Sequence, residues 1–150
     1  MKRILLLVLC FPIAILVNAQ TAVDSVKATI SAMFEGMKNS DTTMIRSAFA
    51  DAAILQTIVQ SKEGKTIVRS EDVSGFVTSI GKLPKGSADE RITFDVVKVD
   101  AALAIAWTPY KFYFNGQLYH CGVNSFQLVR LDGKWKIQYI IDTRRRENCE

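Results

Sequence analysis

The chain has 150 residues and a formal net charge of +4, from 19 lysines and arginines against 15 aspartates and glutamates. Hydrophobic residues make up 49% of it and charged residues 23%, which excludes a disordered chain, a coiled coil and a collagen-like chain. Neither of the two common glycine-rich phosphate-binding motifs occurs. The length is that of one domain.

The first 19 residues have the three-part pattern of a secretory signal peptide. A basic start precedes an apolar run over 4–17, and Val17 and Ala19 stand at the −3 and −1 positions of a cleavage site. The apolar run is shorter than the ~20 residues that a membrane-spanning helix needs. We therefore expect cleavage after Ala19, a mature domain over 20–150 that is periplasmic or secreted, and no stable membrane insertion after cleavage.

Two positive charges leave with this segment, which lowers the net charge of the mature chain from +4 to +2. The basic run over 144–146 is interpreted as the solvated end of a strand, because no aromatic residues are interleaved with it. The sequence therefore gives no indication of a nucleic-acid partner.

Three helices are predicted in the first half of the chain. Apolar residues recur at three- and four-residue steps over 22–38, which is the pattern of an amphipathic helix. Asp41 is a good N-cap for a second, short helix. Ser70 or Asp72 can cap a third helix, which Gly81 would end.

Strands are predicted for most of the remaining chain, and two of the turns between them are closely specified. Asn115-Gly116 and Asp132-Gly133 favour two-residue hairpins, whose central positions both need positive φ. The predicted strands are 53–60, 65–70, 91–99, 102–114, 117–131 and 134–143. Because helices come first and a long antiparallel sheet follows, we expect an α+β fold with the helices packed on one face of a curved sheet.

The hairpin turns also predict which residues share a face of the sheet. Counting from the second turn places Phe126 opposite Tyr139, and counting from the first places Trp107 opposite Asn124. This face is apolar, so it is expected to lie under the helices. The register beyond Pro109 stays open, because a bulge there or at the opposite residue would exchange the two faces.

Three stretches of the chain are informative about its family. The segment 49–53, the hairpin 107–126 and the hairpin 128–137 with its D-G-K-W-K-I pattern resemble the nuclear transport factor 2-like superfamily, which includes ketosteroid isomerases and SnoaL-like cyclases. The apolar start and the ending over 142–145 are similar to its small secreted bacterial branch, described as "putative lumazine-binding". The resemblance implies a cone-shaped fold around a pocket and, commonly, a homodimer through the outer face of the sheet.

The resemblance also allows a test of the ketosteroid isomerase mechanism. That chemistry needs a carboxylate base and a donor that stabilises an oxyanion. The position that corresponds to the base is Thr57, and the tyrosine of the first helix corresponds to the region of Met33 and Phe34. Neither position carries the required group, so the isomerase mechanism is not expected.

Five residues are candidates for ligand binding. Trp107, Tyr110 and Tyr139 could stack on a flat ligand such as a pterin or a flavin, while Asn124 could orient it. Phe126 belongs to the same expected face of the sheet. Packing within the core of a curved sheet is the alternative role of these aromatic residues.

His120, the only histidine, is the candidate acid or base of an enzyme. Asp95 and Asp142 are conceivable partners on neighbouring strands. The alternative is a histidine at the end of a hairpin that contacts water, and the sequence does not determine which way it points. No metal site is indicated, because no carboxylates or thiols cluster with His120 in the sequence, and no cofactor is implied.

The mature chain contains two cysteines, Cys121 and Cys149. An even number of cysteines in an exported chain predicts a disulfide, and the alternative is two free thiols. For function, we expect an exported small-molecule binding protein with an aromatic-lined pocket and no catalytic activity. The alternative is a SnoaL-like isomerase, cyclase or dehydratase that uses His120.

Overall fold

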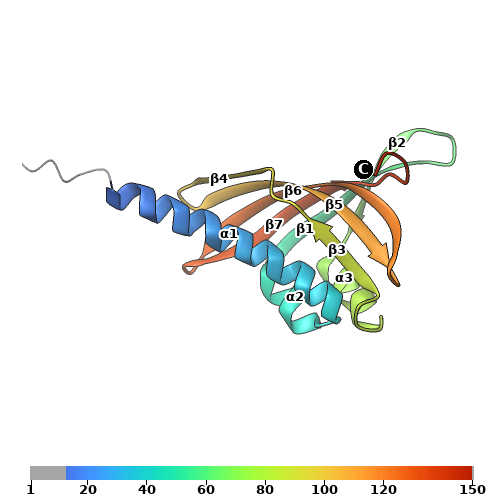
Figure 1. Ribbon diagram of the computed structural model, residues 1–150, viewed down its shortest axis with the longest axis horizontal. Helices are drawn as coiled ribbons and strands as arrows, with labels where there is room; N and C mark the ends of the chain where they lie inside the picture. Colours follow the sequence, from blue (N-terminus) through green and yellow to red (C-terminus); the bar gives the residue numbers. More distant parts are fainter. Residues whose placement is uncertain (1–12, 150) are drawn as a thin grey trace, which may run out of the picture.

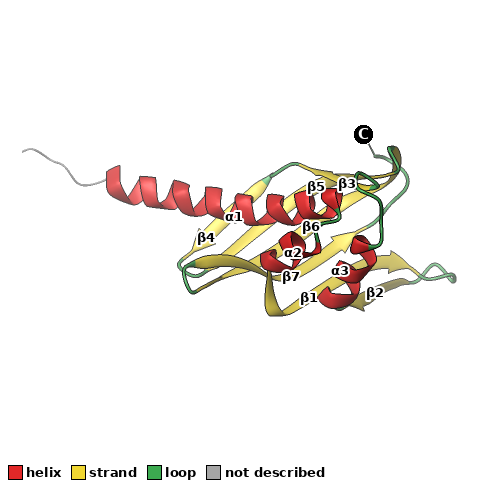
Figure 2. Cartoon of the chain, turned by 90° about the horizontal axis from the view of Figure 1, so that it is seen from below, coloured by secondary structure: helices red, strands yellow, loops and turns green. Residues whose placement is uncertain are grey.

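The computed structural model describes residues 13–149, with side chains from Thr21 onward. In this part of the chain, three helices lie along one side of a curved, open sheet (Figure 1). The long helix α1 (Ile13–Asn39) runs beneath the sheet, and the short helices α2 (Thr42–Ala48) and α3 (Val73–Gly81) lie near its C-terminal end (Figure 2). This arrangement confirms the expected α+β class.

Seven strands form the sheet. Their bounds are β1 (Phe49–Gln60), β2 (Thr66–Glu71), β3 (Ala88–Ile92), β4 (Val96–Asp100), β5 (Leu103–Phe114), β6 (Gln117–Leu131) and β7 (Lys134–Thr143). The order across the sheet is β2-β1-β7-β6-β5-β3, and β4 also pairs with β5. All pairs are antiparallel except β1 with β7, whose parallel pairing brings the first strand next to the last.

Helices α2 and α3 begin at aspartates, as the sequence predicts. The side chain of Asp41 accepts a hydrogen bond from the backbone N–H of Met44 at 2.9 Å, and that of Asp72 accepts one from Gly75 at 2.8 Å. These bonds satisfy N–H groups that the start of a helix leaves without a partner. Asp72, rather than Ser70, therefore caps the third helix.

Helix α1 is longer than the helix predicted over 22–38. It begins at Ile13, inside the segment predicted as a signal peptide, and residues 1–12 lie outside the described part of the chain. Cleavage after Ala19 therefore stays a prediction. Among the described residues, no helix has the length and apolar character that crossing a membrane requires.

The single strand predicted over 91–99 is wrong, because this segment forms two strands that pair with successive parts of β5. The break lies opposite Pro109. The carbonyl of Pro109 accepts a hydrogen bond from the N–H of Thr93 at 3.0 Å, but a proline has no N–H to give back. The pairing therefore resumes at Val96 with a shift of one residue. The irregularity lies on the side of β5 that faces β3 and β4, and not on the side that faces β6.

The two hairpin turns have the predicted conformation. The backbone angle φ is 50° and 78° at Asn115 and Gly116, and 48° and 77° at Asp132 and Gly133. The first pairs of residues beyond each turn also agree with the predicted register.

Each hairpin also contains a bulge that its turn does not predict. Tyr119 of β6 is unpaired in the ladder with β5, and Gln138 of β7 is unpaired in the ladder with β6. A bulge adds one residue to one strand, so it exchanges the faces of the residues beyond it.

The two bulges make two predicted pairings wrong. Trp107 pairs with Ser125 rather than with Asn124, and Tyr139 does not face Phe126. The side chains of Trp107 and Tyr139 therefore point to the outer face of the sheet, away from the helices.

The inner face of the sheet and the helices enclose the core. Phe34 of α1 packs edge-to-face on Phe126 of β6, with ring centroids 6.1 Å apart. The fully buried side chains include Val26, Ile30, Ile45, Phe126, Leu128 and Ile137. Leu128 and Ile137 face each other close to the second hairpin turn, so the core reaches that end of the sheet.

Candidate functional site

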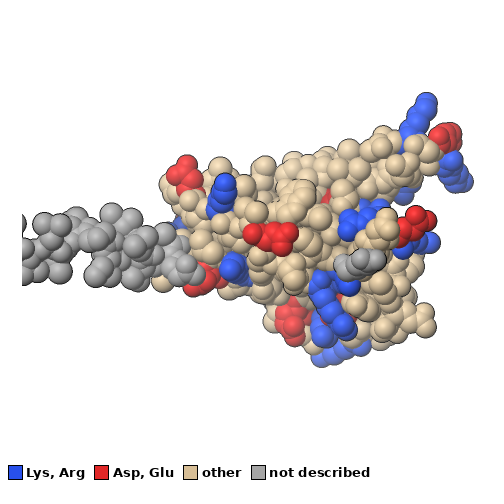
Figure 3. Space-filling view, turned by 45° about the horizontal axis from the view of Figure 1, so that its top comes forward, with Lys and Arg blue, Asp and Glu red and all other residues tan. Residues whose placement is uncertain are grey.

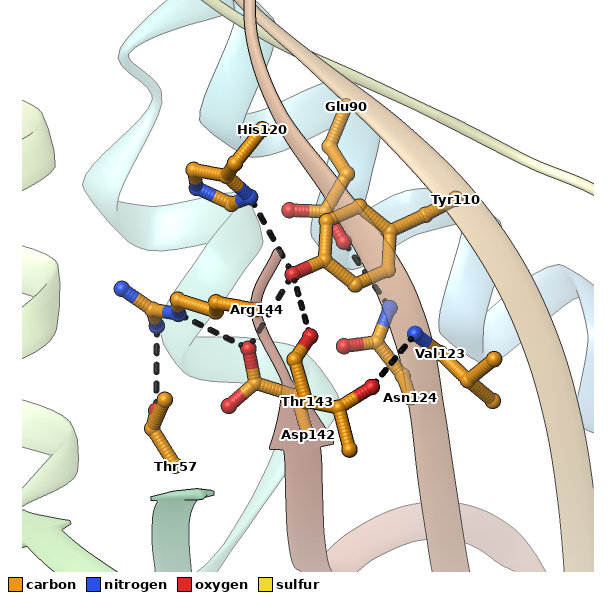
Figure 4. Close-up of polar contacts among 9 residues, drawn as sticks. All are labelled: Thr57, Glu90, Tyr110, His120, Val123, Asn124, Asp142, Thr143 and Arg144. Carbon is orange, nitrogen blue, oxygen red and sulfur yellow. Dashed lines mark hydrogen bonds and ion pairs between the residues drawn. The ribbon is translucent and has the colours of Figure 1, made fainter. Parts of the chain in front are cut away.

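A cavity of about 310 Å³ lies between the inner face of the sheet and helices α1 and α3. Its apolar wall includes Met33, Phe34, Met37, Phe76, Phe112, Phe126 and Ile140. Its polar wall includes Thr57, Glu90, His120, Asn124, Asp142 and Arg144 (Figure 4). An apolar wall with a few convergent polar groups is typical of small-molecule sites.

A larger groove elsewhere in the molecule is less suited to a ligand. It measures about 800 Å³ and lies between α1, α2 and the turn that joins β6 to β7. Its lining consists mostly of alanine, serine and threonine, with Arg130, Lys134 and Lys136 from the strands and no carboxyl or imidazole group. We therefore place the candidate site in the smaller cavity.

Glu90 of β3 and Asn124 of β6 are joined by a hydrogen bond at the cavity. Nδ2 of Asn124 donates to Oε1 of Glu90 at 2.8 Å, and Oε2 has no hydrogen bond within the described chain (Figure 4). Burial is the main cause that raises the pKa of Glu90 to about 7, and the negative charge of Asp142 raises this pKa further. The hydrogen bond from Asn124 and the positive charge of Arg144 oppose the shift. Glu90 can therefore gain or lose a proton near neutral pH.

The buried hydroxyl of Tyr110 lies between three polar groups. It is 2.9 Å from the carbonyl oxygen of Thr143, 3.3 Å from Oδ2 of Asp142 and 3.2 Å from Nδ1 of His120. The hydroxyl has one proton and the two oxygens only accept, so we assign Nδ1 of His120 as the donor to Tyr110. Burial raises the pKa of Tyr110 well above its usual value, so the hydroxyl stays protonated.

His120 points to the inner face, where its ring stacks on that of Phe112 with centroids 4.9 Å apart. Burial and the charges of Arg144 and Arg146 lower its pKa to about 4, although Asp142 opposes this shift. His120 is therefore neutral at neutral pH, with Nε2 as its acceptor.

The two aspartates considered as partners of His120 differ in their placement. Asp142 belongs to the same cluster and reaches His120 through the hydroxyl of Tyr110. Asp95 is exposed in the segment between β3 and β4 and takes no part in the cluster. In the described chain, no group of three or more histidine, cysteine or carboxylate side chains is placed to hold a metal ion.

Arg144 links Asp142 to the first strand. Its Nε forms an ion pair with Oδ2 of Asp142 at 2.8 Å, and its Nη2 donates to Oγ1 of Thr57 at 3.1 Å. The guanidinium compensates a carboxylate that is only 9% exposed. Thr57, the position that corresponds to the base of the isomerases, thus serves as a hydrogen-bond partner of an arginine.

The chain beyond β7 is held beside the cavity. A disulfide joins Cys121 to Cys149, and the backbone groups of Cys121 and Arg145 exchange two hydrogen bonds of 2.9 Å. Gly122 permits this close approach, because a Cβ atom there would lie 1.8 Å from the carbonyl oxygen of Thr143. The predicted disulfide is therefore present, and it fixes the C-terminal segment against β6.

Three of the five residues predicted to bind a ligand lie at the cavity. Asn124 and Phe126 line it, and Tyr110 supports its polar wall through its hydroxyl. Trp107 is 47% exposed, and it and Tyr139 lie on the outer face of the sheet. The placement predicted for Trp107 and Tyr139 is wrong because the bulges shift both strands by one residue.

Sequence reasoning misses Glu90 and Arg144 as cavity residues. Glu90 lies on the same inward face of β3 as Ala88 and Ile92, but the strand is predicted to begin only after it. Arg144 belongs to a basic run that charge patterning interprets as solvated. Its position two residues after Asp142, on the same face of an extended segment, is the signal that could locate it.

Comparison with known families gives one match that spans most of the chain. The model of the family described as "putative lumazine-binding" matches residues 21–139. No match was found among curated protein sequences.

Solved structures share the fold. An NTF2-like (nuclear transport factor 2-like) protein of unknown function from Shewanella baltica OS155 has a TM-score of 0.68 and 18% identity, and the match covers 84% of this chain and 95% of that one. An NTF2-like putative dehydratase from Streptomyces avermitilis has a TM-score of 0.61, 16% identity, and 84% and 97% coverage. An NTF2-like protein from Cytophaga hutchinsonii has a TM-score of 0.60 and 12% identity, and the match covers 81% of this chain and 97% of that one. The chain therefore belongs to the putative lumazine-binding family and has the NTF2-like fold.

Proposed function

We propose that this protein binds a flat, nitrogen-containing ring compound in the cavity of about 310 Å³. The observation that carries the proposal is the aromatic wall beside the hydrogen-bonded pair of Glu90 and Asn124. Phe76 and Phe112 line the cavity, are partly exposed and offer apolar surface to a ring, while a carboxyl and a carboxamide can exchange hydrogen bonds with ring nitrogens and carbonyls. The description of the family names lumazine, a flat pteridine, which supports this ligand class.

Titration with lumazine and native mass spectrometry of the purified protein test this proposal together. Ser79 of α3 is exposed and lines the cavity, so the Ser79→Trp variant should fill the opening and weaken lumazine binding by more than about tenfold. Its neighbour Thr78 is exposed but does not line the cavity, so Thr78→Trp is the matched control. Lumazine binding that survives Ser79→Trp, or the absence of both lumazine binding and a co-purifying small molecule, would contradict the proposal.

We also propose that the mature protein begins at Gln20 and acts outside the cytoplasm. The signal-peptide pattern supports this location, as does the disulfide between Cys121 and Cys149, since disulfides persist in oxidising compartments. N-terminal sequencing of the native protein should find Gln20 and the intact mass should rise on reduction. A chain that begins at Met1 would contradict export.

A homodimer through the outer face of the sheet completes the proposal. Large apolar side chains are exposed on this face at Val96, Leu103, Ile105 and Trp107. Figure 3, turned to bring the top of the sheet forward, shows few charged side chains along it. Exposed apolar side chains gathered on one face are typical of protein–protein contacts. Sedimentation equilibrium should therefore find a dimer, and a monomer at all concentrations would contradict this.

Acid–base catalysis on the bound compound is a second candidate function, and Glu90 favours it. Its pKa is near 7, and its Oε2 is free of hydrogen bonds within the described chain. His120, with a pKa of about 4, is the weaker base at neutral pH. If the co-purifying compound is turned over, Glu90→Gln should reduce the rate by about a hundredfold or more. Turnover that persists in Glu90→Gln would exclude this role, and no turnover by the wild type would favour binding alone.

A further inference from the structure

The basic run at 144–146 lies at the mouth of the cavity. A second hollow of about 250 Å³ is lined by Tyr119, His120 and the three arginines, and it shares Tyr119, His120 and Arg144 with the main cavity. The disulfide at Cys149 and the backbone bonds of Arg145 hold this segment in place. The arginines therefore form a fixed rim rather than a loose end.

The three arginines differ in how their charges are satisfied. Arg144 is paired with Asp142, and the Nε of Arg145 donates to the carbonyl of Asn148 at 3.4 Å. Arg146 lies over the ring of Tyr119, 4.9 Å from its centroid, and donates from Nη2 to its hydroxyl at 3.1 Å. Within the described chain, no carboxylate pairs with Arg145 or Arg146.

Arg146 is the guanidinium best placed to meet a ligand. Arg145 forms an isolated bridge with Cys121, and Arg146, which follows it in a bend, lines the same hollow as His120. The charge of Arg146 contributes to the lowered pKa of His120, as expected for groups that lie close together. Contact with Tyr119 restricts the arginine side chain, so little conformational entropy remains to be lost when a ligand binds.

Two other acidic residues near the opening do not neutralise Arg146. Glu147 is exposed and forms no ion pair in the described residues. Glu71 lines the cavity from β2, which β1 and β7 separate from β6 in the order of the sheet. Among the described residues, no carboxylate therefore forms an ion pair with Arg146.

We propose that Arg146 is the anchor of an oxyanion site at the mouth of the cavity, and that the ligand is a flat ring compound carrying one carboxylate. This inference rests on the proposed function, because it requires the ring to occupy the cavity. The planar guanidinium matches a carboxylate with two parallel hydrogen bonds. The charge of Arg146, which has no carboxylate partner among the described residues, attracts a negative group on the ligand. The ring would lie against Phe76 and Phe112 with its carboxylate beside His120, whose neutral ring does not repel it.

Two lumazine derivatives that differ only in charge test the inference. Lumazine-6-carboxylate and its carboxamide have the same ring and nearly the same size, and calorimetry measures the affinity of each. Arg146→Ser should lower the affinity for the carboxylate by about tenfold and change the affinity for the carboxamide by less than about twofold. Arg146→Lys should restore part of the loss. Arg130→Ser, which removes an exposed arginine that lines the separate groove, is the matched control and should change neither affinity.

The outcomes separate this inference from the function on which it rests. Added salt should lower the affinity for the carboxylate and leave the affinity for the carboxamide unchanged, because salt screens the interaction between exposed charges. If the wild type binds both compounds equally, or if Arg146→Ser weakens both alike, the oxyanion site is wrong and the ring-binding cavity stands. If neither derivative nor lumazine binds, the proposed function itself is wrong and the oxyanion site falls with it.

Discussion

The two ends of the inner face of the sheet are built differently. At the turn end, defined by Leu128, Trp135 and Ile137, the side chains are apolar and buried and the register follows the Asp-Gly turn. At the site end, defined by Glu90, Asn124 and Asp142, the inward side chains are polar and lie beyond the bulge in β7. A regular apolar ladder packs against the helices, whereas a bulge bends the strand and re-aims its side chains. The fold therefore keeps its stability and its chemistry at opposite ends.

The largest expected effect is at the turn end. Trp135 is 6% exposed in the core, so Trp135→Ala should lower the free energy of unfolding by about 3–5 kcal/mol. The affinity for lumazine at the site end should change by less than about twofold under conditions where the variant is folded. Urea unfolding and lumazine titration measure the two quantities. A large loss of affinity with little loss of stability would show that the two ends are not separate.

The disulfide between Cys121 and Cys149 lies at the site end of the sheet. Removing it with Cys149→Ser opens a loop with a sequence separation of 28, which should cost about 3.5 kcal/mol in the chain-entropy model. Hydrogen exchange at Leu128, which requires global unfolding, should accelerate in proportion to this loss, and the amides of Cys121 and Arg145, whose mutual hydrogen bonds lie next to the bridge, should accelerate further through local opening. Equal acceleration at all three amides would mean that the disulfide supports the whole fold rather than the rim.

A pH series isolates the buried carboxyl of the site end. The pKa of Glu90 rises on folding from 4.5 to about 7, so the protonated form stabilises the fold, and this contribution is lost as the pH rises through 7. Glu90→Gln keeps the shape without the charge, so it should match the wild type near pH 4 and exceed its stability by about 3 kcal/mol near pH 8.

The contribution of His120 to stability changes with pH in the opposite direction, and it cancels in the difference between the wild type and Glu90→Gln. Its pKa falls on folding from 6.5 to about 4, so its contribution is present above pH 6.5 and is lost as the pH falls toward 4. Because the wild type and Glu90→Gln both contain His120, the difference between them reports Glu90. A difference in unfolding free energy that does not change with pH would show that folding does not raise the pKa of Glu90.

The turn end could be predicted from the sequence because its geometry is locally determined. Asp132-Gly133 specifies its own turn, and alternation carries the register to Leu128 and Ile137 without interruption. Pro109 likewise predicts an irregularity, since it lacks an N–H, although the side of β5 on which it falls depends on the neighbouring strand.

The site end could not be predicted in the same way, because its bulges depend on contacts between distant segments. Tyr119 and Gln138 carry no turn chemistry, and nothing local marks them as bulges. The close approach of Gly122 to Thr143 requires the end of β7 to be in place, which a pattern within one strand does not report. Glu90 enters the cavity only once β3 pairs with β5.

The smallest expected effect on stability concerns the other tryptophan, and it is the sharpest check on the bulge in β6. Trp107 is 47% exposed and pairs with Ser125 on the outer face, so Trp107→Ala should change the unfolding free energy of the monomer by less than about 1 kcal/mol. It should leave the affinity for lumazine within about twofold and weaken the dimer, because it removes the largest exposed apolar side chain of that face. Sedimentation equilibrium, urea unfolding at low concentration and lumazine titration measure the three effects. If Trp107→Ala instead reduces lumazine affinity tenfold and leaves the dimer unchanged, Trp107 faces the cavity as unbroken alternation predicts, and the bulge at Tyr119 does not exist in solution.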